Sequence, residues 1–431
     1  MKKIVTLLLA LLILVSLCAC GNSQEQQGGS AFDTIVAGYG KVDVTPTAPV
    51  HLGSYGDAMT RVSTGVRDEF YAITVAITDS NDNTVLIIMT DLSWGHINQL
   101  TEIRARVEKQ YGIPGDNILL GGTHNHNGPE WMNEGFMTSK NQLYFNSIWY
   151  PGVMESIEMA LNDRKPATFE IATTETENVG FVRRYFTSDG SFYGSGRDTL
   201  SGTPIEHETE GDEEVQLAYL RREGEGQDIL IAQWQNHGCH YGNTTYASTD
   251  WIGPMRTEVE EALGCKFIYL QGVAGNMATK SMIKDEYPRE KTVAEIASDV
   301  ATVIIDAAED ASNFTAISKG DAVKIKRVTF TDTTERNGQP FDCEMTIVGV
   351  GGLSFITVPV ELFAESGIEI KERTPYDMTM IMCYANGICS YVGTELAFQN
   401  GGYGVEDGRG NPQTANKMVD LYIDTLTELH G

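Results

Sequence analysis

The chain has 431 residues, of which 41% are hydrophobic, enough for a large buried core. Its 59 acidic residues outnumber the 31 Lys and Arg residues, and the formal net charge is -28. Such a charge repels the phosphates of nucleic acid and of anionic lipid, so we expect no nucleic-acid partner and no electrostatic adhesion to a membrane. The acidic residues are dispersed except over residues 208–214, which we interpret as a solvated loop.

The N-terminus has the build of a bacterial lipoprotein signal. Two lysines precede an apolar run over residues 4–17, which is too short to span a bilayer comfortably and is typical of a signal peptide. A small residue, Ala19, precedes Cys20, whereas the larger Leu17 precedes Cys18. We therefore predict cleavage before Cys20 and attachment of lipid to its thiol. Ordinary secretion with cleavage nearby is the alternative.

This interpretation divides the chain into three parts. Residues 1–19 are the predicted lipoprotein signal peptide, residues 20–33 the lipidated Cys20 with a Gln-, Gly- and Ser-rich flexible tether, and residues 34–431 one folded domain. The domain is then extracytoplasmic and anchored to the bacterial membrane, at the cell surface or in the periplasm, through the lipid on Cys20. No protein partner is implied.

Periodicity in the remaining chain predicts strands that alternate with helices. We predict strands over residues 35–44, 72–78, 85–90, 117–121, 229–234, 267–270, 353–358 and 378–384, and helices over residues 99–111, 254–263 and 292–308. Apolar strands in alternation with helices favour an α/β fold, a mixed β-sheet core flanked by helices, with functional sites at the strand ends.

One predicted strand ends in a histidine pair. The motif Gly121-Gly122-Thr123-His124-Asn125-His126-Asn127-Gly128-Pro129 places His124 and His126 two positions apart just after an apolar run. On a strand such side chains share one face, so both imidazoles can point into one pocket and begin a zinc site. Two hydrogen-bonded histidines in a polar turn are the simpler alternative.

Other predicted strands also end in residues suited to chemistry. The strand over residues 229–234 leads into Asn236-His237-Gly238-Cys239-His240, and the strand over residues 353–358 leads into Pro359-Val360-Glu361. Each residue taken singly has a simpler interpretation, such as a hydrogen-bonded core histidine or an acid in the first turn of a helix. Spacing alone does not connect residues so far apart.

Five cysteines lie beyond the signal region. They are Cys239, Cys265, Cys343, Cys383 and Cys389, and their odd number predicts at least one free thiol. Their spacing matches no compact zinc-thiolate motif, so we interpret them as mostly buried small apolar residues.

Six blocks in one order resemble the catalytic domain of the neutral, non-lysosomal ceramidases. They are residues 38–46, 123–129, 236–240 with 248–250, 271–276, 359–361, and Tyr391 with Tyr403. The resemblance spans nearly the whole predicted domain. It implies a zinc-dependent amidohydrolase that cleaves the linear amide of N-acylsphingosine, and therefore a lipid substrate and a role in sphingolipid metabolism.

The resemblance also implies the zinc ligands. The first histidine of the Thr-His-x-His block is His124, and the histidine that closes the Asn-x-x-Cys-His block is His240 rather than His237. The acid of the Pro-x-Glu block is Glu361, and the tyrosine that opens the last loop is Tyr391. Two imidazoles, a carboxylate and a phenolate are a sensible zinc shell.

The implied catalytic residues surround these ligands. His126 resembles the histidine that contacts the attacking water, and Tyr403 the second tyrosine lining the site. Arg183 resembles the arginine near the scissile amide, with Arg184 as a rival because the asparagine that usually precedes this arginine is Val182 here. Asp250 is a plausible acceptor that orients a ligand imidazole.

Two departures from the ceramidase pattern affect the expected substrate. The serine that follows the Ala-Gly-Asn block in the family is Ala278 here, and Thr279 stands one place later. The chain also ends at Gly431, so we expect no C-terminal immunoglobulin-like domain. Alternatives are therefore hydrolysis of another ester or amide, in a glycolipid, N-acyl amine or cell-wall fragment, and a surface lipoprotein that binds without catalysis.

Overall fold

The computed structural model describes residues 34–131, 138–196, 198–223, 228–284, 291–317, 322–387 and 390–431. The predicted signal peptide, Cys20 with its lipid, and the tether lie outside the described residues, as does Cys389. Within the described ranges, no helix combines the length and apolar character needed to cross a membrane.

A nine-stranded mixed sheet forms the centre of the fold. Its strands run in the order β14 (Lys266–Gln271), β12 (Ile229–Trp234), β11 (Glu214–Arg222), β6 (Lys165–Glu175), β1 (Val36–Asp43), β3 (Tyr71–Thr78), β4 (Thr84–Thr90) and β5 (Ile118–Gly122), with β16 (Thr315–Ala316) beside β6. The pairs β12–β14 and β4–β5 are parallel. The mixed sheet confirms the predicted fold class.

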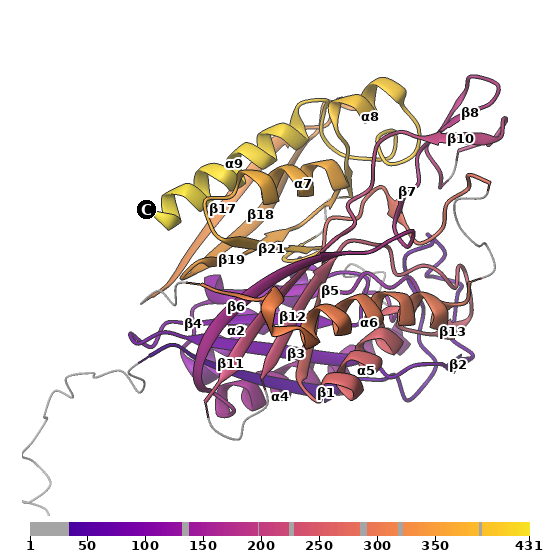
Figure 1. Cartoon of the computed structure of the whole chain (residues 1–431). Coiled ribbons are helices and arrows are strands. Elements are labelled where there is room, and N and C mark those ends of the chain that lie inside the picture. The colour runs from indigo at the N-terminus through magenta and orange to yellow at the C-terminus, as the bar shows by residue number, and fades with distance from the viewer. Residues whose placement is uncertain are drawn as a thin grey trace, which may run out of the picture.

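A second, four-stranded sheet packs face to face on the first (Figure 1). It consists of β17 (Val323–Thr333), β18 (Pro340–Val350), β19 (Leu353–Val358) and β21 (Met378–Cys383), with β19 and β21 parallel. Ile87 and Ile231 of the large sheet share one buried apolar cluster with Phe355 and Met380 of the small sheet. Burial of this interface removes a large apolar area from water and joins the two sheets into one core.

Helices cover the outer faces of both sheets and complete four layers. On the large sheet lie α2 (Ile97–Tyr111), α4 (Tyr150–Asn162), α5 (Ile252–Leu263) and α6 (Val293–Glu309), and on the small sheet α7 (Ala364–Arg373) and α9 (Thr414–His430). Figure 1 shows α7 and α9 on one side of the stacked sheets and α4 and α5 on the other. Each helix buries one apolar stripe against its sheet.

The close contact between α4 and β1 depends on two glycines of the first resembling block. A Cβ atom on Gly38 would lie 2.0 Å from the carbonyl oxygen of Ala160, and one on Gly40 would lie 2.0 Å from that of Ser156. Any side chain at these positions would therefore push the helix off the strand.

Shorter elements connect the layers. They are α3 (Ser139–Tyr144), α8 (Glu395–Asn400), β2 (Gly65–Val66), β7 (Phe181–Val182), β8 (Tyr185–Thr187), β9 (Phe192–Tyr193), β10 (Pro204–His207), β13 (Tyr246–Ala247), β15 (Met277–Ala278), β20 (Glu361–Leu362) and β22 (Tyr391–Val392). Strands β8, β9 and β10 form a small antiparallel sheet that projects beside α8 at the upper right of Figure 1.

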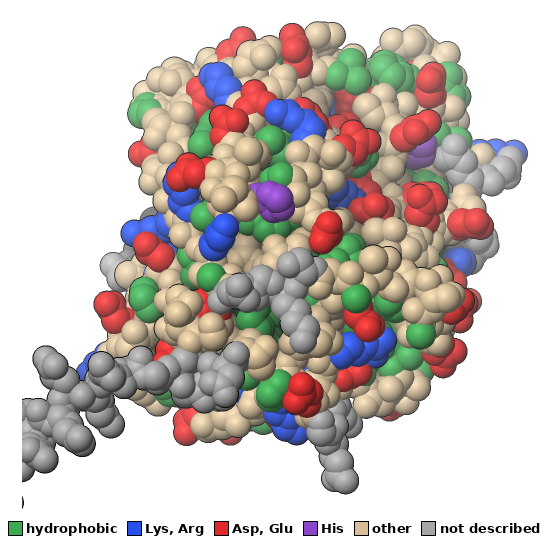
Figure 2. All heavy atoms as spheres, turned by 60° about the vertical axis from the view of Figure 1, so that its left-hand side comes forward, with side chains coloured by type: hydrophobic (Ala, Val, Ile, Leu, Met, Phe, Trp, Pro, Cys, Tyr) green, Lys and Arg blue, Asp and Glu red, His purple; other side chains and the backbone are tan. Residues whose placement is uncertain are grey.

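Figure 2 shows acidic and basic side chains interspersed over the face that it draws. The interpretation of residues 208–214 as a solvated loop is wrong for two members. Glu208 and Asp212 are buried, and each forms an ion pair, Glu208 with Arg184 and Asp212 with Lys371 at 2.8 Å.

Four of the five cysteines beyond the signal region lie among the described residues. Cys239, Cys265, Cys343 and Cys383 are free thiols, of which Cys343 and Cys383 are buried.

Candidate metal centre

The histidine pair lies in a turn just beyond β5 rather than on the strand. His124 has a left-handed backbone, with φ of 59°, and its N–H donates to the carbonyl of Leu92 at 3.0 Å. The alternation of side chains on a strand is therefore the wrong reason for their proximity. The turn nevertheless brings both buried imidazoles together, with ring centroids 4.9 Å apart and the ring planes perpendicular.

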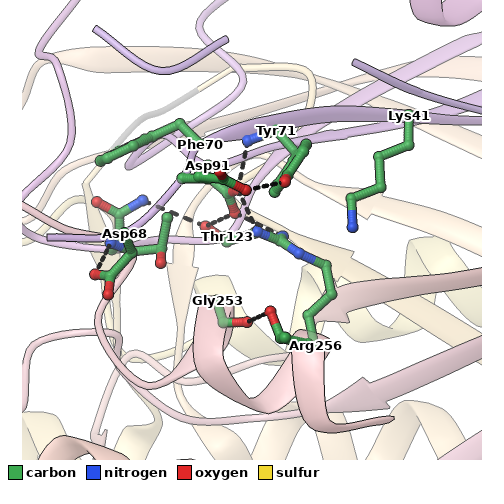
Figure 3. Close-up of polar contacts among 12 residues, drawn as sticks. Lys41, Asp68, Phe70, Tyr71, Asp91, Thr123, Gly253 and Arg256 are labelled. Carbon is green, nitrogen blue, oxygen red and sulfur yellow. Dashed lines mark hydrogen bonds and ion pairs between the residues drawn. The ribbon is translucent and has the colours of Figure 1, made fainter. Parts of the chain in front are cut away.

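A buried ion pair supports this turn (Figure 3). Arg256 of α5 donates to both carboxylate oxygens of Asp91, at 3.1 and 2.8 Å, and Asp91 also accepts from the backbone of Tyr71 and the hydroxyl of Thr123. The side chains of Asp91 and Arg256 are almost completely buried. Because Thr123 directly precedes His124, this network fixes the start of the histidine turn to the end of β4 and to α5.

A third histidine and a carboxylate complete the cluster. His237 follows β12, and its ring nitrogen lies with those of His124 and His126 in a group whose ligand atoms are all within 4.8 Å of one another. Oε2 of Glu361 lies 3.6 Å from Nε2 of His124 and 3.5 Å from Nε2 of His237. Four chemically competent side chains from three distant parts of the chain therefore meet at one buried point.

His240 is not part of this cluster, contrary to the predicted ligand set. Its Nδ1 lies 2.8 Å from the hydroxyl of Thr279, and its Nε2 lies 2.9 Å from the carbonyl oxygen of Lys291. Both ring nitrogens are engaged elsewhere, so the histidine that the Asn-x-x-Cys-His block contributes to the cluster is His237.

The pairing of two short strands sets Glu361 beside Tyr391. Strands β20 and β22 are parallel, with Glu361 opposite Tyr391 in register. Gly275 lies against this pair, because its N–H donates to the carbonyl of Leu362 at 2.9 Å and a Cβ there would lie 2.6 Å from the carbonyl oxygen of Glu361. The glycine of the Ala-Gly-Asn block thus permits a backbone contact that holds Glu361 in place.

Arg183 is the arginine that reaches the cluster. Its Nη2 contacts Nε2 of His237 at 3.2 Å and donates to the hydroxyl of Tyr391 at 3.0 Å and to the carbonyl of Gly275 at 2.9 Å. Arg184 points away and pairs with Glu208. The structure therefore separates the two rivals, and Arg183 alone lies where a group bound at the cluster could contact it.

Tyr403 lies on the same side as Arg183. The rings of Tyr391 and Tyr403 are 5.3 Å apart between centroids, and Tyr403 is partly exposed. All four of His124, His126, Glu361 and Tyr391 are buried. The arrangement is a buried donor cluster with one tyrosine at its solvent side.

Asp250 and Thr279 have structural roles that differ from those considered in the sequence. Asp250 accepts from the backbone N–H groups of His240 and Tyr241, at 3.0 and 2.9 Å, rather than from an imidazole. Thr279 bonds to His240, which confirms that it does not replace the missing serine at the cluster. Both residues stabilise the loop that follows His237.

Hydrogen bonds determine which nitrogen atoms are free to bind a cation. The carbonyl of Ser93, which can only accept, lies 3.0 Å from Nδ1 of His124, so that nitrogen carries the proton. Arg183 can only donate, so Nε2 of His237 accepts from it. Nε2 of His124 therefore carries a lone pair on the side of Glu361, 3.6 Å away, whereas Nε2 of His237 lies between Arg183 and Glu361, 3.2 and 3.5 Å from them.

Burial sets the protonation states of the cluster. Burial and the Arg183 guanidinium lower the pKa of His237 to about 3, and burial with the other two imidazoles lowers the pKa of His126 well below its ordinary value. Burial opposes ionisation of Glu361, but the adjacent imidazoles of His124 and His237 outweigh it and lower its pKa to about 2. At neutral pH His126 and His237 are therefore neutral imidazoles and Glu361 is a carboxylate, the forms that bind metals.

This donor set fits a metal ion such as Zn²⁺. Tetrahedral bonds of about 2.0–2.1 Å place ligand atoms about 3.3 Å apart, close to the separations of 3.3 to 3.6 Å found here. Oε2 of Glu361 and Nδ1 of both His126 and His237 are buried and have no hydrogen-bond partner among the residues that the structure describes. Unpaired buried polar atoms are costly, and a cation would satisfy the carboxylate.

Sequence reasoning missed two neighbours of His124. The motif order favours His240 over His237, although the apolar strand that ends at Trp234 indicates a strand-end position for His237. The sequence predicts Tyr384 only as the last residue of a strand, yet its ring stacks on that of His124, with centroids 3.6 Å apart and planes 8° apart. No sequence signal identifies this contact, because 260 residues separate the two rings.

Fold and donor set together define the centre of a candidate metalloenzyme at the strand ends of an α/β domain. Residues 35–193 match the family model described as "Neutral/alkaline non-lysosomal ceramidase, N-terminal". The match confirms the resemblance recognised in the sequence. Among curated protein sequences, none matches the chain.

Solved structures with the same fold extend beyond the matched segment. The neutral ceramidase from Pseudomonas aeruginosa superposes with a TM-score of 0.74 at 17% identity, over 92% of this chain and 74% of that chain. A structure described as "Ceramidase complexed with C2" gives a TM-score of 0.72 at 16% identity, over 92% of this chain and 75% of that chain. These likenesses establish that nearly the whole described chain has the neutral ceramidase fold.

Proposed function

We propose that this protein is a zinc-dependent hydrolase that cleaves the amide bond of an N-acylsphingosine-like lipid. The observation that carries the proposal is the convergence of His124, His237 and Glu361 on one buried point, with Tyr391 beside the carboxylate. The family of residues 35–193 supports the choice of amide hydrolysis and of a ceramide as substrate.

In the proposed site, His124, His237, Glu361 and Tyr391 hold the ion. A Zn²⁺ ion in such a shell supplies a Lewis acid that polarises an amide carbonyl and lowers the pKa of water to about 7. Ser93 fixes the tautomer of His124, and burial with the Arg183 guanidinium keeps His237 neutral, so the chain itself prepares both imidazoles for a metal.

His126 is the proposed proton carrier. Its Nε2 lies 3.3 Å from Nε2 of His124, and its Nδ1 is buried without a hydrogen-bond partner among the described residues. A neutral imidazole in this position accepts a proton from the attacking water and passes it to the departing nitrogen. This imidazole is neutral because burial lowers its pKa.

Arg183 and Tyr403 stabilise the negative charge that develops on the amide oxygen. Arg183 stays protonated, because its neighbours, Tyr391 foremost among them, raise its pKa even though burial alone would lower it. It is oriented by the carbonyl of Gly275 and by Tyr391. Donors fixed before reaction stabilise an oxyanion without a cost of reorganisation.

Hydrolysis of a related amide or ester is the second candidate. Ala278 occupies the position of the family serine and offers no hydroxyl, and Thr279 bonds to His240 instead. A lipid or other acyl compound whose reaction does not need that hydroxyl would suit the site better than ceramide. The metal ligands and the proton carrier would be the same.

Release of fatty acid from a fluorogenic N-acylsphingosine tests the proposal. We expect release that a chelator abolishes and that added Zn²⁺ restores. An N-acyl amine and an ester with the same acyl chain, assayed in parallel, would identify the second candidate. Retained zinc with no release from any of the three would overturn the hydrolase proposal in favour of a binding lipoprotein, and no retained metal would overturn the metal site.

We also propose that lipid on Cys20 anchors the protein outside the cytoplasmic membrane. The sequence motif that ends at Cys20 is the support. Labelling of cells with a palmitate analogue should mark the wild-type chain and not Cys20→Ser, whereas Cys18→Ser should stay labelled. Equal labelling of all three proteins, or of none, would contradict the anchor.

A further inference from the structure

The small sheet of β8, β9 and β10 ends in a buried ion pair. Arg184 directly precedes β8 and Glu208 directly follows β10, and the N–H of Glu208 donates to the carbonyl of Arg184 at 2.8 Å. Both side chains are only 1% exposed, and Nη2 of Arg184 donates to Oε1 of Glu208 at 2.9 Å, alongside a second bond from Nε. A guanidinium paired in this two-bond manner has a fixed orientation.

The remaining donors of Arg184 hold the loop that carries Tyr403. Nη1 donates to the carbonyl of Tyr403 at 2.8 Å, and Nη2 donates to those of Gly401 and Ala397 at 2.8 and 3.2 Å. Asn400 donates to Glu208 at 2.9 Å, so the carboxylate holds the same loop. One buried ion pair therefore holds α8, through Ala397 and Asn400, and the loop after it, through the carbonyls of Gly401 and Tyr403.

The projecting small sheet also holds Tyr403 from its other sides. Both carboxylate oxygens of Asp198 lie 3.0 Å from the backbone nitrogen of Tyr403, and a Cβ on Gly196 would lie 2.4 Å from the ring of Tyr403. Asp198 thus contacts the amide of Tyr403, Arg184 its carbonyl and Gly196 its ring. The ring in turn lies next to Tyr391, which faces Glu361.

We infer that Arg184, oriented by Glu208, is a positioning residue that fixes Tyr403 for catalysis; this inference rests on the proposed function. A shift of about 1 Å in a group that contacts the reacting atoms costs on the order of 100-fold in rate. Among the described residues, the contacts of Arg184 are with Glu208, the carbonyls of the Tyr403 loop and the rings of Phe192 and Phe363, not with the donors of the metal cluster. We therefore expect its effect on the reaction to pass through Tyr403.

Arg184→Lys is the informative change. Lysine keeps the positive charge beside buried Glu208 but is a point charge with three donors, and it cannot satisfy the carboxylate and three carbonyls together. We expect kcat to fall about 10- to 100-fold with KM changed less than about 3-fold, and zinc content to stay the same. Glu208→Gln should give a smaller loss in the same direction.

Two measurements on the full chain decide the inference. In a double-mutant cycle, Arg184→Lys should lower kcat in the wild-type background and change it less than about 3-fold in a Tyr403→Phe background. In hydrogen exchange, Arg184→Lys should speed exchange of the Tyr403 amide without affecting residues 118–127. The matched control is Arg222→Lys, which alters the ion pair of buried Arg222 with half-buried Asp163 away from the site and should leave both readouts unchanged.

Equal losses of kcat in the two backgrounds would overturn the inference, because Arg184 would then act by a route other than Tyr403. Unchanged exchange at Tyr403 in Arg184→Lys would overturn it irrespective of activity. A wild-type chain that hydrolyses no acyl substrate would instead refute the proposed function, while hydrogen exchange would still decide whether Arg184 holds Tyr403.

Discussion

His237 and His240 lie three residues apart in one loop and occupy opposite environments. His237 is fully buried, with Nδ1 unpaired among the described residues and Nε2 directed at Arg183 and 3.5 Å from Glu361. His240 has both ring nitrogens engaged, by Thr279 and by the carbonyl of Lys291. A histidine is therefore a candidate ligand when a ring nitrogen faces the other donors of the cluster, and a structural residue when both ring nitrogens are hydrogen-bonded elsewhere. Its place in the motif does not decide between the two.

The adjacent arginines repeat this contrast. Arg183 faces His237 and Tyr391, whereas Arg184 is saturated by Glu208 and three backbone carbonyls. Neighbours on an extended segment point to opposite sides, so one enters the cluster and the other holds the loop behind it. Single substitutions in the histidine pair and in the arginine pair can therefore test the proposed role of each residue separately.

His237→Ala should cause the largest loss. Removal of a metal ligand forfeits several kcal/mol of charge stabilisation, so we expect kcat/KM toward the acyl substrate to fall on the order of 1,000-fold or more. Steady-state kinetics at saturating Zn²⁺ would measure this loss. Activity close to that of the wild type in His237→Ala would exclude His237 as a ligand.

Arg183→Met should be the next most harmful change. It removes a fixed donor to the developing oxyanion, and we expect kcat to fall about 100-fold. Single-turnover rates would separate this effect from product release. A variant that loses substrate affinity but keeps kcat would show that Arg183 binds the ground state instead.

His240→Ala should affect stability rather than activity. It removes the ring that bonds the buried hydroxyl of Thr279, at a cost of about 1–3 kcal/mol in the free energy of unfolding. Urea denaturation would measure this cost, and kcat/KM should stay within about 3-fold of the wild type. The reverse pattern, intact stability with lost activity, would restore His240 as a functional residue.

Asp250, which binds the backbone at His240, should give the smallest effect. Burial raises its pKa to about 6, so the folded state holds the proton more tightly than the unfolded state. The stability from this group is present at low pH and is lost as pH rises through 6, by about 1 kcal/mol between pH 5 and pH 7. Urea denaturation between pH 5 and pH 7 should show a smaller fall in the free energy of unfolding for Asp250→Asn than for the wild type. Equal falls in the two proteins would contradict the raised pKa of Asp250.

Local pattern predicted most elements of the large sheet, because its buried strands are short apolar runs bounded by turn residues. Strand β12 of the large sheet and strand β19 of the small sheet match their predicted ranges, and β4, β5 and the helices α2 and α6 begin and end within two residues of theirs. Strand β17 of the small sheet is exposed over much of its length and contains charged residues, so alternation did not reveal it. The sequence therefore predicted β19 and β21 of the small sheet but not β17 and β18.

Strand ends and the order of the motifs predicted most of the residues that form the site. His124, His126, Glu361 and Tyr391 come together as the resemblance implied. The choice between His237 and His240 depended on Thr279 and Lys291, which lie about 40 and 50 residues further along the chain. Contacts at that distance are tertiary, and spacing within the block does not encode them.

Metal content of the full chain and its two histidine variants tests the central claim most directly. Elemental analysis after dialysis should find about one zinc per chain in the wild type and in His240→Ala, and little in His237→Ala. Zinc retained by His237→Ala but lost from His240→Ala would contradict the account, as would a wild-type chain that holds no metal.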